Sequence, residues 1–130
     1  MIVLGSAGAV AAADETADCI AVMQGRADDL ARQVRAGDAA QEPALRAELQ
    51  RAAALIGRAY LDGHHDEAEA RAKLEQAQRA QATMAEAERA SLHAACVRKA
   101  DAELEAASGL QRYVVTRIAQ ARLNRMLAPQ

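Results

Sequence analysis

Apolar residues recur at intervals of three and four along most of the chain, which is the spacing of one face of an α-helix. The first such run falls at Ile20, Met23, Ala27, Leu30 and Val34, with Cys19 beside it. Gly37 follows the run, and glycine is a common residue just past a helix end. The pattern therefore predicts a helix over residues 16–36.

A second helix is predicted from Pro43 to Gly63, because proline suits a first helical position and glycine a helix end. Its expected buried face consists of Leu45, Leu49, Ala52, Ile56 and Ala59.

Residues 66–107 contain no glycine or proline, so the pattern leaves two possibilities open. Asp66 and Glu69 are a plausible capping pair at the start of the segment. It forms either one long helix or two helices that break near Thr83, where Thr83 and Glu86 have the spacing of a capping box.

The last predicted helix, over residues 110–127, has two apolar faces, which suggests a helix wedged between neighbours. The first consists of Leu110, Val114, Ile118 and Ala121, and the second of Val115, Ala119, Leu123 and Met126.

Tyr60 and Tyr113 are expected to pack in the core with their hydroxyls at the surface. Together these patterns predict an all-α fold, an antiparallel up-down bundle of four to five helices.

Composition supports the helical prediction. Alanine, the best helix former, makes up roughly a quarter of the chain, and there is no Phe or Trp. Small side chains bury little apolar area, so a covalent link would help the domain. The net charge of −2 argues against a general nucleic-acid binder.

The two cysteines, Cys19 and Cys96, are predicted to form an intrachain disulfide. In an up-down bundle, one straight helix over 66–107 would carry Cys96 too far from Cys19, whereas a break near Thr83 brings them within reach. The disulfide and the break therefore depend on each other. The alternative is an extended-helix dimer, with free thiols or an interchain bond.

The N-terminal residues 1–13 resemble a signal peptide, with an apolar run and an Ala-x-Ala site before Asp14, although no basic residue precedes the run. An ordinary apolar tail is the alternative. We expect residues 14–130 to be a single domain, exported to the periplasm and soluble, without membrane insertion.

Candidate chemistry is sparse. His64 and His65 could bind a metal weakly at a polar turn, and His93 with Met23 or Met84 could ligate haem. His93 and Cys96 have a spacing that metals accept, but no third ligand lies nearby in sequence. No phosphate loop, nucleophile elbow or His-Glu-x-x-His motif is present, so we expect no enzyme, no catalytic residue and no cofactor.

The expected function is therefore that of a small periplasmic interaction module, chaperone-like, inhibitor or immunity-type, which binds an unknown protein partner. The supporting features are the thin alanine face of the segment that starts at Asp66 and the two apolar faces of residues 110–127, part of which is expected to be left for a partner or for a second copy in a homodimer. The competing hypothesis is a metal- or haem-binding bundle that uses His64 and His65, or His93.

Overall fold

The computed structural model describes the backbone of residues 3–129 and the side chains of residues 15–129, and this part of the chain is all-α. Its elements are α1 (Val3–Arg35), a short 3₁₀ turn η1 (Ala39–Gln41), α2 (Glu42–Leu61), α3 (Glu67–Ala82), α4 (Glu86–Ala106) and α5 (Gly109–Leu127). The first helix begins at Val3 rather than near residue 16. The predicted signal peptide over 1–13 lies outside the described side chains, so it stays a prediction.

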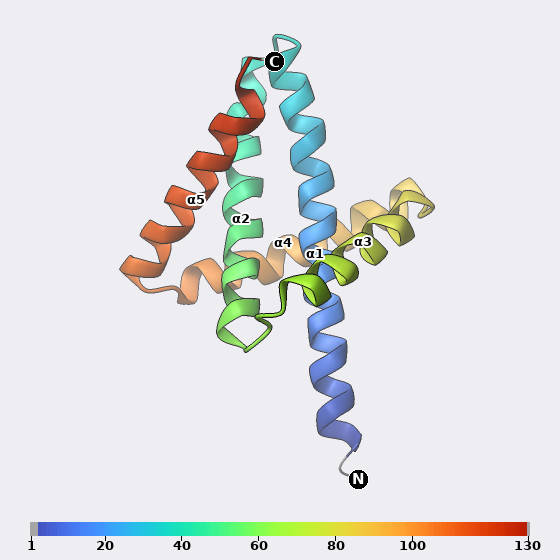
Figure 1. Ribbon diagram of the computed structural model, residues 1–130. Helices are drawn as coiled ribbons and strands as arrows, with labels where there is room; N and C mark the ends of the chain where they lie inside the picture. Colours follow the sequence, from blue (N-terminus) through green and yellow to red (C-terminus); the bar gives the residue numbers. More distant parts are fainter. Residues whose placement is uncertain (1–2, 130) are drawn as a thin grey trace.

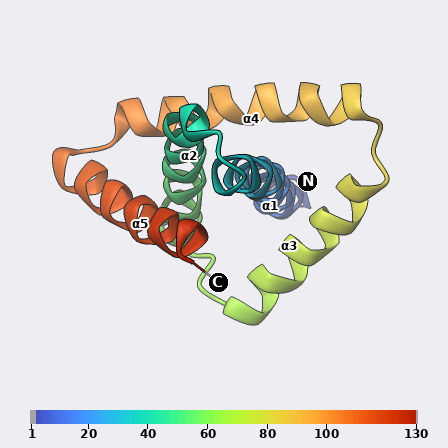
Figure 2. The same cartoon turned by 90° about the horizontal axis from the view of Figure 1, so that it is seen from above.

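The helices are arranged as a central pair surrounded by three others. α1 and α2 run antiparallel as a hairpin, and Gly37 in the turn between them has a φ of +112°, which suits glycine. Viewed from above, α3, α4 and α5 form a triangle around this hairpin (Figure 2). Each of the three packs mainly on α1 or α2. The up-down order is thus seen in α1 and α2, but it is not confirmed for the whole chain because α4 lies across both (Figure 1).

Among the side chains of residues 15–129, the core is formed mainly by two clusters of small and medium-sized residues along the central hairpin. One cluster surrounds the disulfide and comprises Cys19, Val22, Met23, Ala52, Leu55, Cys96 and Ala100. The other comprises Ala27, Leu30, Ala31, Leu45, Leu49, Ala119 and Leu123. The predicted apolar face of the first helix is confirmed by both clusters. Alanines at these contacts let the helix backbones approach closely.

The uninterrupted segment 66–107 is divided into α3 and α4, so the long-helix alternative is wrong. Asp66 caps α3 as predicted, since its Oδ1 accepts a hydrogen bond from the Glu69 N–H at 3.1 Å. The predicted capping box at Thr83 is wrong, because α4 starts after Ala85 and has no side-chain cap. The Thr83 hydroxyl instead donates to the Ala80 carbonyl of α3 at 3.1 Å.

Arginines from the following helix satisfy the carbonyls that each break exposes. Arg89 on α4 donates to the carbonyl of Gln81, near the end of α3, and to that of Met84, in the turn that follows, over distances of 2.8–3.2 Å. Arg112 on α5 donates to the Leu104 and Glu105 carbonyls of α4 at 3.0 and 3.1 Å. These bonds replace the helical bonds that the last carbonyls of a helix lack.

A full capping box starts α5. The Gln111 N–H donates to the Ser108 hydroxyl, and the Ser108 N–H donates to the Gln111 side chain. This pair stabilises the first turn of α5 and fixes the residue at which the helix begins.

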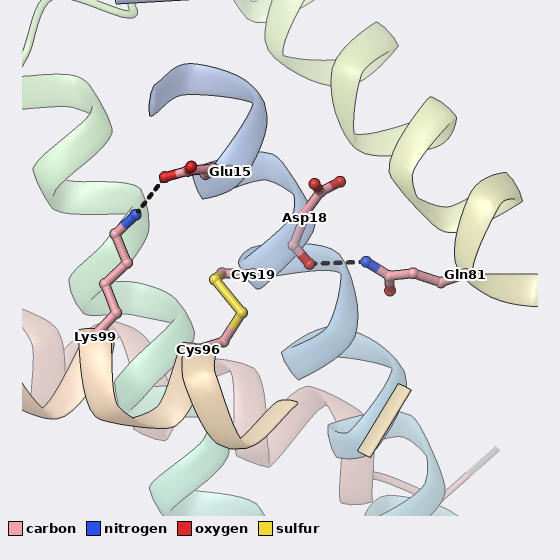
Figure 3. Close-up of a disulfide and its surroundings, with 6 residues drawn as sticks. All are labelled: Glu15, Asp18, Cys19, Gln81, Cys96 and Lys99. Atoms are coloured by element: carbon pink, nitrogen blue, oxygen red, sulfur yellow. Dashed lines mark hydrogen bonds and ion pairs between the residues drawn. A yellow bond between two sulfur atoms is a disulfide. The ribbon is translucent and has the colours of Figure 1, made fainter. Parts of the chain in front are cut away.

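The predicted disulfide is confirmed at the point where α4 crosses α1. Cys19 and Cys96 are bonded, with their Cα atoms 5.2 Å apart. Two polar contacts flank the bond (Figure 3): Lys99 of α4 pairs with Glu15 at 3.5 Å, and Gln81 of α3 donates to the Asp18 carbonyl at 2.9 Å. One short stretch of α1 is thereby fastened to both α3 and α4.

Reduction of the disulfide is expected to lower the free energy of unfolding by about 4 kcal/mol, because the bond joins residues 77 positions apart and restricts the unfolded chain. Urea unfolding with and without reductant measures the change. The double variant Cys19→Ala/Cys96→Ala is the control and should show no response to reductant. Equal stability of the oxidised and reduced wild-type chain would contradict the prediction.

Candidate functional site

The turn between α2 and α3 holds the two histidines considered as metal ligands. The His65 imidazole stacks on the Tyr60 ring, with centroids 4.1 Å apart, and its Nε2 lies 2.6 Å from the Tyr60 carbonyl oxygen. Since a carbonyl only accepts, Nε2 must carry the proton and donate. Among the described side chains no three His, Cys, Asp or Glu residues gather around a common point. The metal site at His64 and His65 stays a prediction.

Both histidines border a cleft of about 380 Å³ between α1, α2 and α3. Its apolar walls come from all three helices and comprise Ala17, Ile20, Ile56, Ala59, Tyr60, Ala70 and Leu74. Its polar rim comprises Thr16, Gln24, His64, His65, Asp66, Glu69, Arg71 and Lys73. A volume of this size falls within the range of small-molecule sites.

The cleft forms where α3 packs mainly on α1 and leaves part of α2 uncovered. Ile56 was predicted to be a core residue of the second helix, and this is wrong, since 44% of it is exposed where α3 fails to cover α2. The core face of α2 shifts by one position, so that Leu55 is buried instead.

A buried carboxylate, Glu48, lies between α2 and α4. Its Oε1 is 2.8 Å from His93 Nε2 and 3.3 Å from an Arg51 guanidinium nitrogen. Only 5% of the Glu48 side chain is exposed, and its Oε2 is buried without a hydrogen-bond partner among the described residues. Such a group is costly to bury, so the contacts of Oε1 matter for stability.

Two further ion pairs extend this contact between α2 and α4. Arg51 pairs with Asp101, and Arg58 with Glu103, each at 3.0 Å. The hydrogen bond to the Glu103 carboxylate, together with its charge, raises the pKa of Arg58 above its ordinary value. The interface between these helices is therefore held by polar contacts as well as by the disulfide cluster.

The residues considered as haem ligands have other structural roles in the fold. Met23 is fully buried in the disulfide cluster, and His93 uses its Nε2 for the contact with Glu48. Met84 lies in the turn between α3 and α4. A haem held by His93 and Met23 would require the core to open.

His93 also borders a polar groove of about 810 Å³ between α1, α3 and α4. Several of the groove's charges are already engaged: Arg32 pairs with Asp29, and Arg89 donates to carbonyls of the α3–α4 turn. The groove brings charges of both signs together, so it favours neither an anionic nor a cationic ligand.

The two apolar faces of α5 differ in their exposure. The helix buries its second apolar face, with Ala119 and Leu123 in the core. Its first face remains open to solvent at Leu110, Val114 and Ile118. Together with the neighbouring exposed Tyr113, these residues form what we call the α5 stripe. The prediction of a wedged helix is therefore wrong. The predicted packing of the two tyrosines is also wrong, since Tyr60 and Tyr113 are 62% and 61% exposed.

The contact between His93 and Glu48 is expected to stabilise the fold. His93→Ala should lower the free energy of unfolding by roughly 1–3 kcal/mol, because it leaves the buried carboxylate with Arg51 alone. His64→Ala, at an exposed turn, is the matched control and should change it by less than about 0.5 kcal/mol. Urea unfolding of both variants checks this, and equal effects would show that the buried contact contributes nothing.

No membrane-spanning candidate is found among the described helices, all of which are too short or too polar to cross a bilayer. The chain matches no family model, and no curated protein or solved structure shows significant similarity to it. The function must therefore be argued from the α5 stripe, the cleft and the buried carboxylate themselves.

Proposed function

We propose that the chain is a non-enzymatic interaction module of the bacterial periplasm, which binds a partner protein through the α5 stripe. The observation that supports this most is the exposure of four large apolar residues on one half of one helix. Leu110 is 73% exposed and Ile118 52%. Single exposed apolar residues are common, but a contiguous set on one helix face is typical of an interaction surface.

Contacts with the rest of the molecule hold α5 so that the α5 stripe faces outward, toward a partner. Its C-terminal half is anchored, since Ala119 and Leu123 lie in the core and Arg35 of α1 donates to the Met126 carbonyl at 2.7 Å. Its N-terminal half is held by the Ser108 capping box and by the bonds from Arg112 to α4. A helix fixed at both ends presents its outer face with little loss of conformational freedom on binding.

The charge of α5 indicates the kind of partner. The helix carries four arginines and no acidic residue. Arg112 is engaged with α4, which leaves Arg117, Arg122 and Arg125 available for contact with another molecule. A partner with acidic side chains around an apolar strip would complement this surface. Pairing of the stripe with that of a second copy would bring like charges together, so a different protein is favoured over a homodimer.

The disulfide supports the proposed location. Such bonds form and persist in oxidising compartments, of which the bacterial periplasm is one. Both cysteines of the chain are used in this bond.

Photo-crosslinking in the native host tests the proposed surface. A photoreactive phenylalanine analogue is placed at position 113 in one variant and at position 60 in another, two tyrosine sites of almost equal exposure. We expect position 113 to give a discrete product with one protein, which mass spectrometry identifies. The product should weaken at high salt and disappear when Val114→Glu is added, because a carboxylate within the apolar stripe is costly to bury.

Four results would contradict the proposal. They are an identical product from position 60, a product unchanged by Val114→Glu, a product that is a dimer of this chain, and no product together with binding of the chain to anionic phosphatidylglycerol vesicles. The urea midpoint of the Val114→Glu variant, expected to equal that of the wild type, shows that a lost product does not reflect unfolding.

A further inference from the structure

The geometry points to a second binding site, independent of the α5 stripe: the cleft between α1, α2 and α3 binds a small amphipathic anion with an apolar chain and a carboxylate. Nothing in the proposed interaction through α5 uses this cleft, whose walls are formed by other helices.

The interior of the cleft suits an apolar chain. Ile20 of α1, Ile56 of α2 and Leu74 of α3 face it from three sides. Ile56 is 44% exposed although it belongs to a helix whose neighbouring positions 52–55 are all buried. A ligand chain between α2 and α3 would cover the surface that α3 leaves open, and covering it is favourable by about 25 cal/mol per Å².

The rim of the cleft determines the sign of the ligand's charge. Glu69 is compensated, since it pairs with Lys73 at 3.6 Å. Asp66 stays charged but caps α3, where its Oδ1 accepts the Glu69 N–H and the helix dipole offsets part of its charge. Arg71 makes no ion pair within residues 15–129 and lies on the same rim. A carboxylate at the end of an apolar chain would therefore meet a guanidinium that has no ion-pair partner among residues 15–129, and a guanidinium binds carboxylates in a two-pronged geometry.

The aromatic edge of the cleft is already ordered. The stack of Tyr60 and His65 and the bond from His65 Nε2 to the Tyr60 carbonyl fix both rings beside the opening. A ligand would thus enter a site whose walls need little rearrangement, which limits the entropic cost of binding.

Two ligands that share one apolar chain and differ in charge test the site: decanoate and decyltrimethylammonium. Isothermal titration calorimetry on the intact chain is expected to show one saturable decanoate site, with affinity at least about tenfold higher than for the cation. Ile56→Glu should weaken decanoate binding about tenfold or more, since it places a like charge in the apolar wall. Arg71→Gln should reduce the preference for the anion to within about threefold.

Ile118→Glu on the α5 stripe is the matched control, because it makes the same change at an exposed isoleucine outside the cleft and should leave decanoate binding unaltered. Amide chemical-shift mapping of the wild-type chain supplies a reading that needs no variant: decanoate should perturb residues 56–60 and 70–74, and not those of α5. Equal affinity for the two ligands, equal weakening by both glutamate variants, shifts centred on α5, or no saturable binding would each overturn the proposal. None of these outcomes bears on the crosslinking at position 113.

Discussion

The crossing of α1 and α4 at the disulfide is the constraint on which the rest of the arrangement depends. α4 lies across the central hairpin instead of along it, and a crossing helix shares fewer side-chain contacts with its neighbours than an aligned one (Figure 1). The contacts that hold it are the buried disulfide cluster and a set of polar pairs from α2, of which that between Glu48 and His93 is the most buried. With α4 fixed there, α3 and α5 are carried to opposite sides of the hairpin (Figure 2). The cleft beside α3 and the stripe on α5 both follow from that placement.

Much of the helical architecture could be predicted from the chain itself. The spacing of Met23, Ala27 and Leu30 predicted the buried face of α1, and Gly37 and Gly63 marked helix ends that the structure confirms. The pairing of Cys19 with Cys96 was also predictable, because it required a break in the segment 66–107. The up-down geometry that brings the two cysteines together in a simple bundle is not the one that α4 follows. A covalent restraint between two positions limits the possible folds, but it does not determine the angle at which the helices cross.

The turns and the exposed surfaces are harder to predict from the sequence. The break after Ala82 depends on Arg89, a residue of the next helix whose side chain reaches back to two carbonyls. Such a contact has no signature in a local window, whereas Thr83 has the spacing of a cap that it does not form. Ile56 and Ile118 have helical spacing and apolar character like any core residue. Their exposure results from which neighbours pack against them, and only the three-dimensional arrangement contains that information.

The count of cysteines has a consequence for how the protein reaches its folded state. With two cysteines in the chain, only one intrachain pairing exists, so oxidation cannot trap the wrong internal partner. The helices α1 and α2, which pack on each other, are complete in the nascent chain well before Cys96 is made. The wrong bond that can still form is an intermolecular disulfide, made by Cys19 before Cys96 of the same chain is in place. Formation of the bond therefore requires a thiol oxidant but no exchange between internal pairings, and its yield should depend on how concentrated the newly made chains are.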